Sequence, residues 1–149
     1  MRFLVVDDEY LALNRLKALL KPYGECDAAI HANQACGMFR VAVSTKRPYD
    51  LVTIDIDMPE TSGTELLRLV REIEEKAGMP PTKIIMVSAS SSYQNVYQSI
   101  AHKCDDFIVK PVEKDVLHKK LQALGLIEPE APEWLHEKLA AARAAHKPT

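Results

Sequence analysis

The chain has little cysteine, and the cysteines that it has are poorly spaced for cross-linking. Only Cys26, Cys36 and Cys104 occur in 149 residues, and no two have the C-x-x-C spacing. An odd number of cysteines without that spacing argues against both a disulfide framework and a zinc site. We therefore expect reduced thiols inside one domain, since this length suffices for a single core and is too short for two full domains.

A strong net charge and a long apolar run are also missing. The formal net charge of -2 argues against a sequence-independent grip on nucleic-acid phosphates. The apolar run of the N-terminal MRFLVVDDE is too short for a signal peptide, and three acids end it. No later stretch is long enough to span a bilayer. These absences predict a cytoplasmic protein that binds neither nucleic acid nor membrane directly.

What the chain does contain is a regular alternation of strand-length apolar runs with segments of helical spacing. The five runs are FLVVD (3–7), CDAAIHA (26–32), DLVTID (50–55), KIIMVS (83–88) and DFIVK (106–110). Leucines recur at helical spacing between the first two runs, as do apolar residues at 66–73 and 93–100 and from 113 to 124. This alternation predicts an α/β domain of (βα)5 type, in which helices cover both faces of a parallel sheet.

The alternation ends near Gly125. The segment IEPEAPEW follows, and then an alanine-rich stretch from 135 to 146 that favours helix. We predict a domain over 1–124, with a linker and a C-terminal helical extension over 125–149. Trp134, Leu135 and Leu139 give the extension an apolar side, which we expect to dock on its own domain, ahead of a partner or a second copy, because intramolecular docking loses less entropy.

Carboxylates follow two of the predicted strands: Asp7 and Asp8 come after the first, and Asp55 ends the third. The carboxyl ends of parallel strands meet at one edge, which is where such sheets bind ligands. Crowded carboxylates are costly without a cation, and oxygen ligands suit Mg²⁺. Ser88 and Lys110 end two further strands. Together these groups predict a cradle for a phosphoryl group, with one carboxylate as nucleophile.

In these motifs the chain resembles the receiver domain of two-component response regulators over residues 1 to about 124. The matching segments are VVDDE at 5–9, IDIDMPETSG at 54–63, MVSAS at 86–90 and DDFIVKP at 105–111. The resemblance implies a flavodoxin-like three-layer sandwich with strand order 2-1-3-4-5. It also implies a stand-alone, phospho-accepting switch that does not act as an enzyme beyond self-catalysed phosphoryl transfer and dephosphorylation.

The resemblance further implies a role for each site residue. Asp55 would accept the phosphoryl group, and Mg²⁺ would be held by Asp7, Asp8, Asp55 and the backbone carbonyl of Asp57. Ser88 would move toward the phosphoryl oxygens and Lys110 would pair with them, while Phe107 would turn inward as the switch residue. Ala89 would leave space above the phosphoryl group, and a cis peptide bond is expected before Pro111.

Three residues depart from the family pattern. Asp57 adds a negative charge two residues after the acceptor, Ser90 is a short hydroxyl at a position that tunes the lifetime of the phosphoryl group, and Lys103 replaces a common glycine. Since lysine rarely adopts positive φ, the turn geometry at Lys103 is open. Asp57 either disfavours the phosphorylated state or positions a water molecule.

The predicted partners are a sensor histidine kinase or a histidine phosphotransfer protein as donor, and a downstream protein target that reads the face from Tyr93 to Lys110. A homodimer through the C-terminal extension is an alternative assembly. Two other functions compete with the phospho-accepting switch. One is a pseudo-receiver that binds partners without phosphorylation. The other is a phosphatase of haloacid-dehalogenase type with Asp57 as acid/base, against which the order of the motifs and the absence of a cap domain argue.

Overall fold

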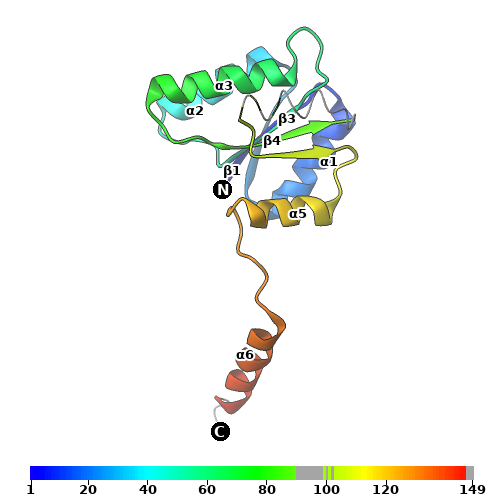
Figure 1. The fold of residues 1–149 in the computed structure, drawn as a ribbon, viewed down its shortest axis with the longest axis vertical. Coiled ribbons are helices and arrows are strands. Elements are labelled where there is room, and N and C mark those ends of the chain that lie inside the picture. Colours follow the sequence, from blue (N-terminus) through cyan, green and yellow to red (C-terminus); the bar gives the residue numbers. More distant parts are fainter. Residues whose placement is uncertain (90–98, 100, 102, 147–149) are drawn as a thin grey trace.

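The fold is a parallel sheet with helices on both faces, and a separate C-terminal helix stands apart from it (Figure 1). A computed structural model describes residues 1–89, 99, 101 and 103–146. The strands of this part of the chain are β1 (Arg2–Val6), β2 (Glu25–Ala29), β3 (Leu51–Asp55), β4 (Lys83–Ser88) and β5 (Asp106–Val109). They pair in parallel in the order β2-β1-β3-β4-β5, which confirms the predicted topology.

The helices and the short 3-10 turn connect the strands. They are α1 (Tyr10–Leu20), η1 (Lys21–Tyr23), α2 (Ala32–Ser44), α3 (Gly63–Ala77), α5 (Lys114–Ala123) and α6 (Glu133–Ala145). The ends of α3 show why it begins and stops where it does. The side chain of Ser62 accepts a hydrogen bond from the Glu65 N–H at the N-terminus, and Gly78 takes the left-handed conformation, φ 65°, at the C-terminus.

Two core clusters pack on opposite faces of the sheet. Helices α2 and α3 cover one face, where Leu4, Val52 and Met86 contact them, and α1 and α5 cover the other, where Phe3, Leu51 and Ile85 lie. Every residue of β3 is buried, as expected for the middle strand of a sheet covered on both sides. This burial is what fixes Asp55, the last residue of β3, inside the protein.

The predicted strands agree with the observed ones to within a residue or two, except at one end. The second was expected to continue to residue 32, but β2 ends at Ala29. His31 instead caps α2, because its Nδ1 accepts a hydrogen bond from the Gln34 N–H. The expected helix around Tyr93 and Tyr97, as well as Ser90, lies outside the described residues.

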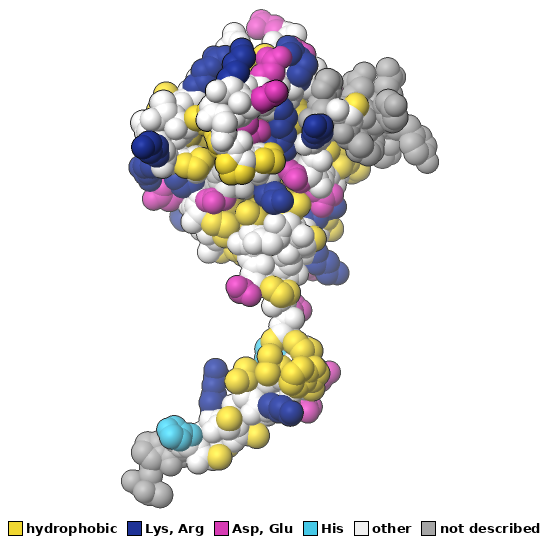
Figure 2. Space-filling view, turned by 60° about the vertical axis from the view of Figure 1, so that its left-hand side comes forward, with side chains coloured by type: hydrophobic (Ala, Val, Ile, Leu, Met, Phe, Trp, Pro, Cys, Tyr) yellow, Lys and Arg dark blue, Asp and Glu magenta, His cyan; other side chains and the backbone are white. Residues whose placement is uncertain are grey.

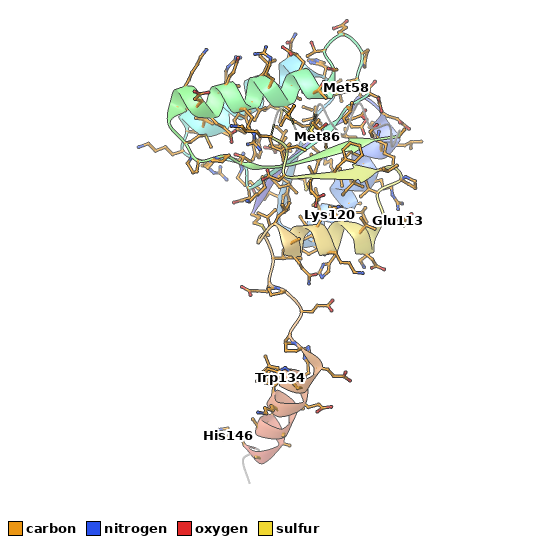
Figure 3. All side chains as sticks on the ribbon, viewed as in Figure 1. Met58, Met86, Glu113, Lys120, Trp134 and His146 are labelled. Carbon is orange, nitrogen blue, oxygen red and sulfur yellow. The ribbon has the colours of Figure 1, made fainter. Side chains whose placement is uncertain are left out.

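The C-terminal extension divides into a packed part and an exposed part. Leu126 and Ile127 pack against the core cluster beneath α5, so contacts with the domain continue past Gly125. None of the side chains of α6 is buried, and the helix stands away from the sheet, with Trp134 and His146 near its two ends (Figures 2 and 3). The expected docking of α6 on its own domain is therefore not seen.

Candidate functional site

Four strand ends bring the predicted site residues to one edge of the sheet. Asp7 follows β1, Asp55 ends β3, Ser88 ends β4 and Lys110 follows β5. These strands are neighbours in the sheet, and all run in the same direction. Residues far apart in the sequence therefore meet here, as the alternating pattern predicted.

The three predicted metal-binding carboxylates form a compact cluster. One oxygen atom from each of Asp7, Asp8 and Asp55 lies within 4.8 Å of the others. Asp7 and Asp55 are buried, whereas Asp8 is exposed. The backbone orients the buried pair: the Glu9 N–H donates to Asp7 Oδ1 at 2.9 Å, and the Asp57 N–H donates to Asp55 Oδ1 at 3.2 Å. Three close oxygens of this type fit a hard divalent cation such as Mg²⁺.

Lys110 places a positive charge against the two buried carboxylates. Its Nζ lies 2.9 Å from Asp7 Oδ2 and 3.6 Å from Asp55 Oδ1. Burial lowers the pKa of Lys110, but the hydrogen bond to Asp7 and the charge of Asp55 outweigh it and raise that pKa overall. The lysine therefore stays protonated and offers a fixed cation beside Asp55. The peptide bond that follows it, Lys110–Pro111, is cis, as the resemblance implied.

Asp55 is the carboxyl group with the strongest perturbation at this edge. Burial, and then the negative charge of Asp7, raise the pKa of Asp55 from 3.8 to about 6. The Asp57 N–H and Lys110 lower it, but they compensate only in part. A carboxylate that is costly to ionise is stabilised in its charged form by a nearby cation, so a cation beside Asp55 would lower its pKa again.

Ser88 is buried, and its hydroxyl donates a hydrogen bond to Asp57 Oδ2 at 2.8 Å. The sequence placed both residues near Asp55 but did not predict this contact. The sequence could show only that Asp57 comes shortly after β3 and that Ser88 ends β4, two strands that pair up to Asp55 and Val87. Only the loop conformation after β3 could show that the Asp57 side chain turns toward β4.

The loop from Asp57 to Ser62 returns the chain to the sheet, and Gly63 starts α3 against the backbone of Asp55. A Cβ at position 63 would overlap the carbonyl oxygen of Asp55 and lie 2.7 Å from Ile56 Cα. The Gly63 N–H donates to the Ile56 carbonyl at 3.0 Å. The glycine is therefore required by this close approach of two backbone segments.

The opposite, amino-terminal ends of β4 and β5 carry a network of charged groups that the sequence did not predict. Arg71 of α3 donates to the carbonyl of Lys103 from both Nε and Nη2, at 3.2 and 2.9 Å, and forms ion pairs with Glu74 and Asp105. Lys103 adopts φ 66°, so the lysine takes the left-handed turn that a glycine would take more easily. The bonds from Arg71 to its carbonyl hold it there.

Phe107, the expected switch residue, is half-buried and packs against the core cluster shared with α3.

The cysteines are free, and burial raises the pKa of each of the three thiols, so they are protonated and weakly nucleophilic. Within the described residues, no helix is both long and apolar enough to cross a membrane.

The match to a family places this site in a known class. The family model described as the response regulator receiver domain matches residues 3–122. The chain belongs to this receiver domain family, whose members are phosphoacceptor switches of two-component systems.

Curated relatives agree with this assignment. The chain is 34% identical over 113 residues to the two-component response regulator ARR18 of Arabidopsis thaliana, covering 75% of this chain and 16% of the relative. It is 33% identical over 125 residues to the two-component response regulator PhoP of Pseudomonas aeruginosa, covering 83% of this chain and 51% of the relative. The chain thus spans about half, or less, of the length of these relatives.

Solved structures show the same fold. A CheY-like response regulator receiver domain protein of Methanospirillum hungatei shares 31% identity with a TM-score of 0.69, covering 83% of this chain and 93% of that one. The receiver domain of the Arabidopsis histidine kinase CKI1, complexed with Mg²⁺ and BeF₃⁻, has a TM-score of 0.73 at 24% identity, covering 85% and 90%.

Proposed function

We propose that Asp55 is the residue that accepts the phosphoryl group, and that a phosphohistidine of a partner protein donates it. The observation that carries this proposal is the position of Asp55 between the carboxylates of Asp7 and Asp8 and the Nζ of Lys110. An Asp55 oxygen would attack phosphorus, and the P–N bond of the donor would break as the new P–O bond forms. The donor imidazole leaves, and an aspartyl phosphate remains.

The carboxylates of Asp7, Asp8 and Asp55, with the backbone carbonyl of Asp57, would hold Mg²⁺. The fit rests on three carboxylate oxygens within 4.8 Å and on the raised pKa of Asp55, which burial causes first and the negative charge of Asp7 second. When bound, Mg²⁺ would neutralise charge on the transferring group. The CKI1 receiver, which shares this fold and was crystallised with Mg²⁺ and BeF₃⁻, supports this choice of cation.

The chain's own groups then hold the product. Lys110 is near enough to Asp55 to pair with a phosphoryl oxygen, and Ser88, at the end of the adjacent strand, carries a hydroxyl that can donate to another. Water entering from the exposed Asp8 side would attack phosphorus, break the P–O bond to Asp55 and release inorganic phosphate, which leaves Asp55 as a free carboxylate; both the gain and the loss of the phosphoryl group would then be self-catalysed. No separate substrate is turned over, which distinguishes this activity from that of an enzyme.

The output would be a change of surface. Movement of Ser88 toward the phosphoryl group would let Phe107, which is half-buried beside β4, turn further inward. The face from Tyr93 through β5 and α5 would then alter its affinity for a downstream protein. A sensor histidine kinase or a histidine phosphotransfer protein would be the donor, and α6, which is exposed, is where a homodimer would form if the chain makes one.

The test is the intact mass of the full chain after incubation with acetyl phosphate. We expect one phosphoryl adduct in the wild type with Mg²⁺, none with EDTA, and none in Asp55→Asn. Asp115→Asn is the matched control, since it removes an exposed carboxylate of α5 that does not belong to the cluster of Asp7, Asp8 and Asp55. An adduct that persists in Asp55→Asn would move the acceptor elsewhere. No adduct under any condition, with the protein folded, would favour the pseudo-receiver.

A further inference from the structure

Residue 57 makes hydrogen bonds to two groups that the proposed reaction uses. Its backbone N–H donates to Asp55 Oδ1 at 3.2 Å, and its side chain accepts a hydrogen bond from the Ser88 hydroxyl at 2.8 Å. The Asp57 carboxylate is exposed, whereas Ser88 is fully buried. The hydroxyl thus points out of the core toward a surface carboxylate.

From this geometry we infer that the Asp57 side chain restrains Ser88 in its unphosphorylated orientation and so opposes the phosphorylated state. The inference rests on the proposed function of Asp55 as acceptor. A serine hydroxyl has one hydrogen, so it can donate to only one acceptor at a time. To donate to a phosphoryl oxygen on Asp55, Ser88 must release the Asp57 carboxylate.

A second effect acts in the same direction. Once Ser88 has left, the Asp57 carboxylate faces a phosphoryl group that also carries negative charge, two residues away along the same loop. Like charges at such short range repel, although solvent screens an exposed carboxylate. The lost hydrogen bond and the new repulsion therefore both favour the unphosphorylated state.

The Asp57 side chain is not part of the carboxylate cluster proposed to bind the metal. The carboxylate oxygens that lie within 4.8 Å of one another, among the residues that the structure describes, come from Asp7, Asp8 and Asp55 and not from Asp57. The backbone carbonyl of residue 57, assigned above to the metal, survives any substitution there. Changes at Asp57 can therefore test the restraint while leaving the three clustered carboxylates in place.

The experiment measures the affinity of the full chain for BeF₃⁻, a phosphoryl mimic, by calorimetry at saturating Mg²⁺. We expect Asp57→Ala to bind about tenfold more tightly than the wild type, the factor that one hydrogen bond to a charged group typically contributes. Asp57→Asn, which keeps an acceptor oxygen but loses the charge, should fall between them. Glu60→Gln, which removes another exposed acid from the same loop, is the matched control and should bind as the wild type does.

A double-mutant cycle with Ser88 separates the hydrogen bond from the charge. In the Ser88→Ala background, Asp57→Ala should tighten BeF₃⁻ binding by less than about threefold, because only the repulsion is left to relieve. Ser88→Cys, a weak donor, replaces Ser88→Ala if that variant does not fold. Thermal unfolding confirms the fold of each variant.

Two results would overturn the inference. One is an affinity of Asp57→Ala that equals or falls below that of the wild type. The other is an equal gain in both Ser88 backgrounds, which would assign the whole effect to charge. If the folded wild type takes up neither BeF₃⁻ nor a phosphoryl group, the proposed function itself fails, and that outcome differs from both of these.

Discussion

Gly63 begins α3 so close to Asp55 that a Cβ on the glycine would overlap the backbone carbonyl oxygen of Asp55. Both segments are held by hydrogen bonds around Ile56, whose carbonyl accepts from the Gly63 N–H at 3.0 Å and whose N–H donates to the Val87 carbonyl at 2.9 Å. The start of α3 is thus part of the structure that fixes Asp55.

Gly63→Ala is therefore expected to lower the free energy of unfolding by about 1–3 kcal/mol, the usual cost of overpacking, and to weaken Mg²⁺ binding by displacing Asp55. Chemical denaturation and Mg²⁺ titration measure the two effects. Gly37→Ala is the control, since nothing lies within 4 Å of a Cβ there and α2 should gain about 0.5–1 kcal/mol. Equal effects of the two substitutions would contradict this account.

The raised pKa of Asp55 predicts how stability varies with pH in the absence of metal. Because the pKa in the folded state, about 6, lies above the ordinary 3.8, the folded protein holds this proton more tightly than the unfolded chain does. The resulting stabilisation is fully present below about pH 4 and is lost as the pH rises through about 6. The ionised carboxylate therefore destabilises the metal-free fold at neutral pH.

Asp55→Asn, which mimics the neutral form, should accordingly stabilise the metal-free protein at pH 7.5 by about 2–3 kcal/mol and by much less at pH 4. Urea unfolding in EDTA across this range measures the difference between variant and wild type. A difference that does not change with pH would show that the pKa of Asp55 is ordinary. Asp115→Asn provides the comparison for an exposed carboxylate.

The hydroxyl of Thr53 is an unfavourable feature of the central strand. Thr53 is 2% exposed, and its Oγ1 has no hydrogen-bond partner among the residues that the structure describes. Thr53→Val, which keeps the shape and removes the hydroxyl, should raise the stability by about 1 kcal/mol. Thr64→Val should do the opposite, because it removes the hydrogen bond between Thr64 Oγ1 and Ser62 Oγ, which lie 2.9 Å apart. Denaturation midpoints of the two variants distinguish these cases.

Lys103 adopts the left-handed conformation at φ 66°, which costs a lysine about 1–2 kcal/mol relative to an allowed conformation. Lys103→Gly removes this strain, although glycine also raises the entropy of the unfolded chain. The net expectation is a stabilisation of about 0.5–1 kcal/mol in thermal unfolding. Lys103→Ala keeps a Cβ and should not raise the stability. A stabilisation by alanine as large as that by glycine would show that the left-handed conformation of Lys103 is not strained.

The order of strands and helices could be predicted from the amino-acid sequence, because apolar runs and helical spacings are local patterns. The sequence also located Asp7, Asp8, Asp55, Ser88 and Lys110, since each stands at the end of such a run and the ends of parallel strands share one edge. The two prolines after Gly125 predicted a linker and a C-terminal helix, and a helix is present over Glu133–Ala145.

The contacts between these polar groups could not be predicted from the sequence. Lys110 lies closer to Asp7 than to Asp55, Ser88 bonds to Asp57, and Arg71 reaches Lys103 from another element. Each of these contacts depends on loop conformations and rotamers of residues distant in the sequence. The exposure of α6 was equally beyond the sequence, because whether an apolar side chain is buried depends on the surface that it meets rather than on its own hydrophobicity.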